Sequence, residues 1–213
     1  MFTPQMKRVL KYVLFGSLAI GLLNIAANFI AVARVGTNVF LSLAIFGFLP
    51  VLAALPAVPV SFIALFWRKS RAWALTVLIS GLIIVLVIPA GIKIGFAIRR
   101  EGFVKLAQRS RPLVSGIRQY EAKYGSPPAD LQALVPEFLP EIPVTGMGAY
   151  PNYEYKVVSK PGEFENNPWV LTVKTSTGIL SWDVFLYLPD QNYPRTGYGG
   201  VLERIEDWAY VHE

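Results

Sequence analysis

A stretch without charged side chains is the feature that most limits how this chain can fold. No Lys, Arg, Asp or Glu occurs between Arg71 and Lys93, which leaves 21 uncharged residues, Ala72 to Ile92. A helix of about 20 mostly apolar residues crosses the hydrocarbon core of a bilayer. The sequence therefore predicts a membrane-spanning helix over 72–92.

Beyond this run the apolar residues thin out to one face. They form a stripe at spacings of 4, 3 and 4 residues: Leu113, Ile117, Tyr120 and Tyr124. This period is helical rather than that of a strand, so we expect the stripe to be the core face of a helix in an extramembrane head. Pro112 predicts a kink or a fresh helix start, and Gly125 predicts the helix end.

Two earlier uncharged runs predict two further spans, so that the three lie at about residues 12–33, 39–67 and 72–92. Three prolines inside the second run predict a kinked or locally broken helix there: Pro50, Pro56 and Pro59.

Small and polar residues follow one line along the first predicted span: Ser17, Gly21, Asn24, Asn28 and Ala31. Small residues allow helices to approach closely, and asparagine can form hydrogen bonds across the contact. We interpret the line as a helix-packing face in preference to a polar path for a ligand.

The distribution of charge separates two domains. Residues 1–98 hold eight basic and no acidic residues, whereas residues 99–213 hold 12 basic and 14 acidic residues. The net charge of +6 therefore comes from basic residues that flank the predicted spans. This position argues against a nucleic-acid-binding patch, which would need basic residues gathered on a folded face. The first expected partner is the lipid bilayer. The positive-inside rule places the N-terminus in the cytoplasm and the head on the periplasmic or extracellular side of a bacterial inner membrane.

The pattern changes after the long helix. The segment from Ser126 to Leu131 predicts the cap and start of a short helix. Alternating residues then predict about four antiparallel strands near 153–157, 169–175, 179–188 and 202–211, with a turn at 176–178. In the third strand we expect Trp182, Val184 and Leu186 on the core face and Asp183 on the opposite one. The expected fold is three membrane helices plus an α+β head, in which one long helix packs on a small antiparallel sheet.

Part of the head resembles the pilin-like heads of type II secretion pseudopilins. The residues that carry the resemblance lie between Ile117 and Pro143: Ile117, Tyr120, Tyr124, Gly125, Pro127, Leu131, Leu134, Val135, Pro136, Leu139, Ile142 and Pro143. The resemblance implies a hydrophobic helix that anchors a small head in the cell envelope. Pilins carry their spanning helix at the N-terminus, so here the head would be reused on an anchor of several spans.

The side chains of most catalytic sites are missing. The chain has no cysteine, and its one histidine, His212, is expected at a frayed terminus. We therefore predict a non-enzymatic protein without metal or cofactor, an assembly or accessory subunit whose spans contact a protein partner or a second copy. The alternative is a module that binds glycan or peptide through an aromatic excess: Tyr150, Tyr153, Tyr155, Trp169, Trp182, Phe185, Tyr187, Tyr193, Tyr198, Trp208 and Tyr210.

Overall fold

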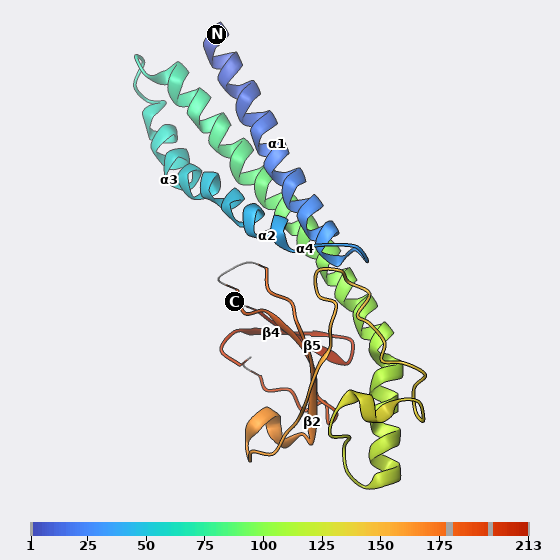
Figure 1. The fold of residues 1–213 in the computed structure, drawn as a ribbon. Helices are drawn as coiled ribbons and strands as arrows, with labels where there is room; N and C mark the ends of the chain where they lie inside the picture. The colour runs from blue at the N-terminus through green and yellow to red at the C-terminus, as the bar shows by residue number, and fades with distance from the viewer. Residues whose placement is uncertain (1, 178–180, 196–197, 213) are drawn as a thin grey trace. The chain divides into compact units, whose positions relative to one another are not determined.

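The computed structural model describes residues 2–177, 181–195 and 198–212 (Figure 1). The chain divides into two compact units. The helical unit comprises Met1–Phe29 and Val39–Ile98, and the head unit comprises Ile30–Asn38 and Arg99–Glu213. One boundary falls between Ile98 and Arg99, as in the sequence-based division. Segment 30–38, however, which that division places with the spans, groups with the head unit.

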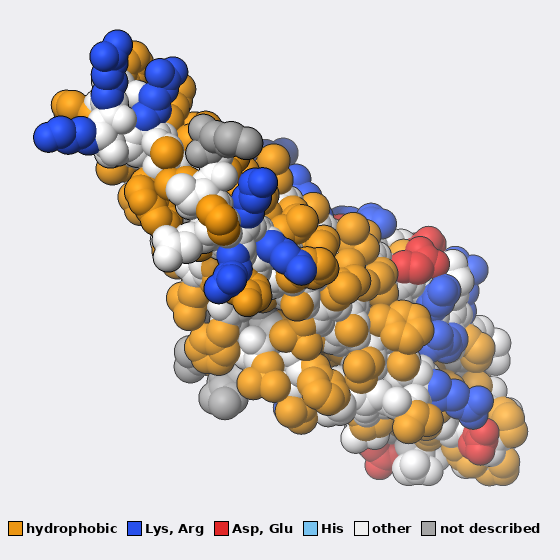
Figure 2. All heavy atoms as spheres, turned by 90° about the horizontal axis from the view of Figure 1, so that it is seen from above, with side chains coloured by type: hydrophobic (Ala, Val, Ile, Leu, Met, Phe, Trp, Pro, Cys, Tyr) orange, Lys and Arg blue, Asp and Glu red, His pale blue; other side chains and the backbone are white. Residues whose placement is uncertain are grey.

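Helices make up the chain as far as Tyr124: α1 (Pro4–Val32), α2 (Val39–Ala44), the 3-10 turn η1 (Ile45–Phe48), α3 (Leu49–Ala64) and α4 (Arg71–Tyr124). Three helical stretches of the described chain, 4–32, 39–64 and 71–124, are long and apolar enough to span a membrane by length and composition alone. Many of their large apolar side chains are exposed, and hydrophobic side chains cover much of the face drawn in Figure 2. The expectation of three candidate spans is confirmed at this level.

The second candidate span is locally broken, as predicted, and the break lies directly before the first of its three prolines. The 3-10 turn η1 precedes Pro50, which lies in the first turn of α3, while Pro56 and Pro59 lie inside α3. A proline in the first turn costs little, because the backbone N–H there has no helical partner. The interruption therefore reflects a new helix start at Leu49–Pro50, and the two later prolines are accommodated.

Helix α4 runs without interruption for 54 residues through Pro112 to Tyr124. The alternative of a fresh helix start at Pro112 is therefore wrong. The predicted end is confirmed: Gly125 adopts φ +75°, and its N–H donates to the Glu121 carbonyl at 2.8 Å. Asp130 then caps the short 3-10 helix η2 (Leu131–Leu134), because its carboxylate accepts from the Ala133 N–H at 3.1 Å.

Five antiparallel strands form one sheet in the order β1-β2-β3-β5-β4: β1 (Glu154–Val157), β2 (Trp169–Lys174), β3 (Val184–Tyr187), β4 (Val201–Ile205) and β5 (Trp208–His212). A 3-10 segment, η3 (Glu163–Asn166), lies between β1 and β2. The single strand expected over 202–211 is instead a hairpin, in which Ile205 pairs with Trp208. β3 begins at Val184 rather than at residue 179, and the turn expected at 176–178 extends outside the described residues.

Both faces of the central strand β3 are covered, and this corrects the assignment of faces in that strand. Leu186 belongs to an apolar cluster with Val170, Leu188, Ala209 and Val211. Phe185 and Tyr187 lie on the other face, toward α4: Phe185 stacks on Phe103 with ring centroids 5.1 Å apart. Asp183 shares this face and is buried, whereas Trp182 lies outside the strand and is 80% exposed. Simple alternation fails here because neither face of β3 meets water.

Candidate functional site

The small and polar residues of α1 are used inside the protein. Ser17, Gly21, Asn24, Asn28 and Ala31 are all buried. A Cβ on Gly91 of α4 would overlap the Gly21 Cα, so the two backbones are in close contact. This face packs helices within the chain and is not free for a partner protein.

The asparagine amides of this face bond mainly to their own helix. Asn28 Nδ2 donates to the Asn24 carbonyl at 3.0 Å, and Asn24 Nδ2 donates to the Ile20 carbonyl at 3.2 Å. These bonds satisfy donors that would otherwise be costly to bury. The polar groups therefore support close helix packing.

The predicted core stripe of the head is only partly a core. Leu113 and Ile117 are fully buried. Tyr120 is half-buried, and its ring lies 5.5 Å from that of Phe138. Tyr124 is 49% exposed, so its assignment to the core is wrong. In the last turn of α4, Tyr124 packs on Tyr120 of its own helix and on Glu137 and Phe138 of the segment that follows η2.

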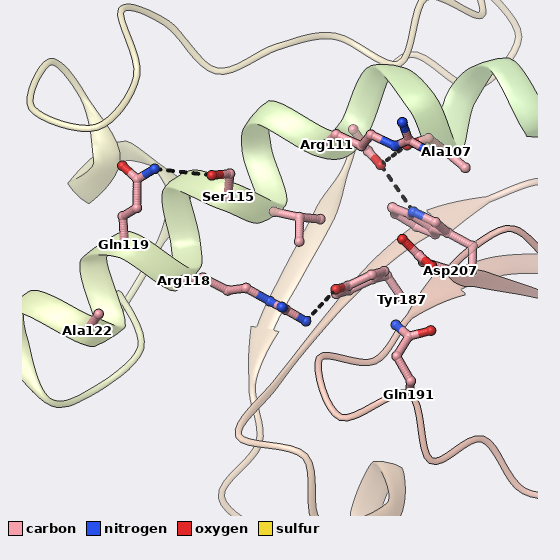
Figure 3. Close-up of a pocket in the computed structure, with 12 residues that line it drawn as sticks. Ala107, Arg111, Ser115, Arg118, Gln119, Ala122, Tyr187, Gln191 and Asp207 are labelled. Atoms are coloured by element: carbon pink, nitrogen blue, oxygen red, sulfur yellow. Dashed lines mark hydrogen bonds between the residues drawn. The ribbon is translucent and has the colours of Figure 1, made fainter.

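A groove runs along α4 where the helix meets β3, β5 and the segment after β3 (Figure 3). Its volume is about 580 Å³. Its lining comes from the helix and from the sheet side: Ala107, Ser110, Arg111, Val114, Ser115, Arg118, Gln119, Ala122, Tyr187, Gln191, Asp207 and Trp208. This volume is within the range of about 300–1,000 Å³ typical of ligand sites.

The floor of the groove is fixed by internal hydrogen bonds. Trp208 Nε1 donates to Ser110 Oγ at 3.1 Å, and Ser110 Oγ donates to the Ala107 carbonyl at 2.7 Å. On the helix side Gln119 Nε2 donates to Ser115 Oγ at 3.1 Å. The indole N–H of Trp208 and the hydroxyl of Ser110 thus already have hydrogen-bond partners within the protein. The remaining polar groups lie at the rim.

Of the two arginines in the groove lining, which also includes Asp207, Arg118 is the one without an ion pair among the described residues. Its Nη2 donates to the Tyr187 hydroxyl and to the Pro189 carbonyl, each at 2.9 Å. No Asp or Glu in the described part of the chain forms an ion pair with it, whereas Arg111 pairs with Glu206 at 3.6 Å. Burial raises the pKa of Tyr187, and the neighbouring Arg118 lowers it in part. The neutral tyrosine therefore orients Arg118 without neutralising its charge.

This arrangement suits a carboxylate. Arginine presents a planar array of N–H donors that can bind both oxygens of a carboxylate. The two hydrogen bonds that Arg118 donates go to neutral oxygens, those of the Tyr187 hydroxyl and the Pro189 carbonyl. The positive charge of Arg118 therefore stays available at the mouth of the groove. Sequence reasoning missed this site, because Arg118 and Tyr187 lie 69 residues apart. The only local signal was an arginine beside the buried Ile117.

A second cluster missed from the sequence is buried. Arg99 is 2% exposed and lies 3.8 Å from the carboxylate of Asp183, which is 6% exposed. The guanidinium also donates to the Thr175 carbonyl and faces the rings of Phe103, Tyr150 and Tyr210 at 5.3, 5.5 and 5.9 Å. Because it is closed to solvent, this cluster is structural rather than a ligand site.

The remaining candidate chemistry is limited. Within the described residues no three His, Cys, Asp or Glu side chains are grouped so that they could hold a metal ion. His212 is the last residue of β5 and stacks on Tyr210 at 4.8 Å, so the expectation of a frayed residue is wrong.

The chain matched no protein-family model, no curated protein and no solved structure in the comparisons. Its architecture nevertheless defines a general class, that of a chain with three candidate membrane spans and an α+β unit built on the third of them.

Proposed function

We propose that this chain is a non-enzymatic membrane protein of the bacterial cell envelope, anchored in the inner membrane as an assembly or accessory subunit. In this proposal its pilin-like head lies on the periplasmic or extracellular side and binds an acidic segment of a partner protein. The observation that carries the proposal is the open groove in which Arg118 has only neutral partners.

In this proposal the helical unit anchors the protein and the head unit binds the partner. The spans hold the protein in the bilayer, and their small, polar face is already used for internal packing. A partner or second copy within the membrane would therefore contact the outward apolar faces of the helices. The groove offers the head a separate site, at which a carboxylate could replace solvent around Arg118.

The glycan or peptide alternative has a narrower basis. Of the eleven aromatic residues in the proposed excess, two are exposed: Trp182 is 80% exposed and Tyr198 is 44% exposed. The others are buried or half-buried, and several stack on one another in the core. A binding platform needs several accessible rings on one surface, so we rank this function second.

Co-purification tests the proposal. The full-length protein would be isolated in mild detergent as the wild type, as Arg118→Ala and as the matched control Arg195→Ala, an exposed arginine outside the groove. A hydrogen-bonded charge contributes about 1.5–3 kcal/mol, so Arg118→Ala should weaken partner retention about tenfold or more. The control should retain the partner, and thermal unfolding would show that both variants fold.

Two results would contradict the proposal. If the wild type runs as an isolated monomer and retains no protein, the subunit function fails. If a partner is retained equally by wild type and Arg118→Ala, the groove is not the docking site.

A further inference from the structure

The bulkiest exposed apolar side chain in the described part of the head unit is a tryptophan. Trp182, on the connection between β2 and β3, is 80% exposed. The base of this connection is well bonded: the Thr175 N–H donates to the Asp183 carbonyl at 2.9 Å, and Ser176 Oγ donates to the Ser181 carbonyl at 2.8 Å. The backbone beside Trp182 is therefore fixed to the sheet, and the indole is presented outward.

The same end of the sheet is bonded to segment 30–38 of the head unit. Asn38 Nδ2 donates to the Ser176 carbonyl at 3.4 Å, and the Gly148 N–H donates to the Ala33 carbonyl at 2.9 Å. Segment 30–38 joins the end of α1 to the start of α2 at Val39. This end of the sheet is therefore bonded to the chain that directly follows α1 and directly precedes α2.

Chain that follows the third uncharged run is bonded to the same end of the sheet. Arg99 follows the uncharged run that ends at Ile92 by seven residues, and its guanidinium donates to the Thr175 carbonyl. Residues that flank each of the three uncharged runs thus belong to the head unit and are bonded within it near the sheet end that carries Trp182.

Other exposed apolar side chains lie at this end. Val35, in segment 30–38, is 95% exposed, and Val201, at the start of β4, is 60% exposed. The register places Val201 there, since Val201 pairs with His212 and Val184 pairs with Val211. Arg34 is exposed as well and could meet lipid phosphates.

We propose that this end of the head unit, defined by Val35, Trp182 and Val201, contacts the lipid headgroup layer of the membrane that the spans cross. Tryptophan concentrates at that layer because its ring is apolar while its N–H can bond to water or headgroups. The contact would hold the head in one orientation on the bilayer. The inference rests on the membrane anchoring of the proposed function, and it depends neither on the groove nor on which side the head occupies.

The absence of cysteine from the sequence makes a direct test possible. The full chain carrying Val201→Cys would be labelled with an environment-sensitive fluorophore and reconstituted in phosphatidylcholine–phosphatidylglycerol vesicles. Ser126→Cys is the matched control, because Ser126 is exposed and follows α4, whose end lies about 37 Å along the helix from Arg99. Quenching by a headgroup nitroxide lipid is compared with quenching by aqueous iodide.

We expect the label at 201 to be quenched by the nitroxide lipid and protected from iodide, with the reverse at 126. Adding Trp182→Ser to Val201→Cys should reduce the lipid quenching at least twofold. Limited proteolysis would show that the double variant is folded.

Three outcomes would overturn the inference. Iodide quenching at 201 equal to that at 126 would place this end in water. Protection at 201 from both quenchers would mean that a protein, rather than lipid, covers it. Unchanged lipid quenching with Trp182→Ser would remove the role of the indole. Arg118→Ala should leave the quenching unchanged, so loss of partner binding and loss of lipid contact can be told apart.

Discussion

Replacement of Asp183 by asparagine should be among the most damaging single polar substitutions in the head. Asp183 is the acidic partner of Arg99, and both side chains are at least 94% buried. Asparagine has nearly the same shape, and its oxygen can still accept the Tyr210 hydroxyl bond, which measures 2.8 Å. The substitution therefore removes the negative charge and little else.

The magnitude follows from what remains around Arg99. Removing one partner of a buried ion pair costs about 3–5 kcal/mol, because the other charge stays buried without compensation. Here the Thr175 carbonyl and three aromatic ring faces still attract the guanidinium, and one such ring contributes about 0.5–2 kcal/mol. We therefore expect the lower end, about 3 kcal/mol, which is a large part of the 5–15 kcal/mol that stabilises a typical domain.

Urea unfolding of the full-length protein in detergent can measure this loss through the fluorescence of the buried Trp169 and Trp208. The double variant Arg99→Met with Asp183→Asn removes both charges and should be less destabilised than the sum of the single variants. The difference is the coupling energy of the pair. A loss below about 1 kcal/mol for Asp183→Asn, or strictly additive effects, would refute the view that the pair is coupled.

Three further predictions concern the core, alkaline pH and orientation. Ile117→Ala should cost about 2–5 kcal/mol in unfolding free energy, since Ile117 is 0% exposed; Ile117→Asp should let protease digest the head while residues 1–98 stay protected, and a resistant head would contradict this. Burial raises the pKa of Tyr153 from 10.0 to about 12, so ionisation of this group leaves stability unchanged below pH 10 and lowers it as the pH rises from 10 toward 12. Tyr153→Phe should be at least as stable at neutral pH, because the hydroxyl is buried without a hydrogen-bond partner among the described residues, and its stability should fall less steeply above pH 10. An impermeant maleimide should label Ser126→Cys but not Ser70→Cys in spheroplasts, and the opposite pattern would reverse the predicted topology.

The helices could be predicted from the sequence because their signals are local. The uncharged run of 72–92 and the position of Gly125 each depend on neighbouring residues alone. The turn between β4 and β5 could not be predicted in this way. Its residue Glu206 has φ +55°, a conformation usually signalled by Gly or Asn, and the sequence there is Glu206-Asp207. The long strand expected over 202–211 follows from that missing signal.

The groove and the Arg99 cluster depend on contacts between distant segments. Arg118 meets Tyr187 across 69 residues of sequence, and Arg99 meets Thr175 across 76. A basic residue on a helix usually faces water, and nothing near Arg99 in the sequence distinguishes it from the exposed Arg100. Only the packing of α4 on the sheet separates a buried cation from a solvated one.

The aromatic excess shows why counting residues could not reveal a function. The rings between α4 and the sheet form a continuous series: Trp169 with Tyr187 at 5.7 Å, Tyr187 with Trp208 at 5.5 Å, Trp208 with Phe185 at 4.9 Å and Phe185 with Phe103 at 5.1 Å. A sheet of five short strands must fill the space under one helix with few side chains, and large flat rings do so most effectively. The excess is therefore largely what a small two-layer unit requires. Of the eleven aromatic residues, Trp182 and Tyr198 are the two that remain exposed, and Trp182, at 80%, is the more exposed.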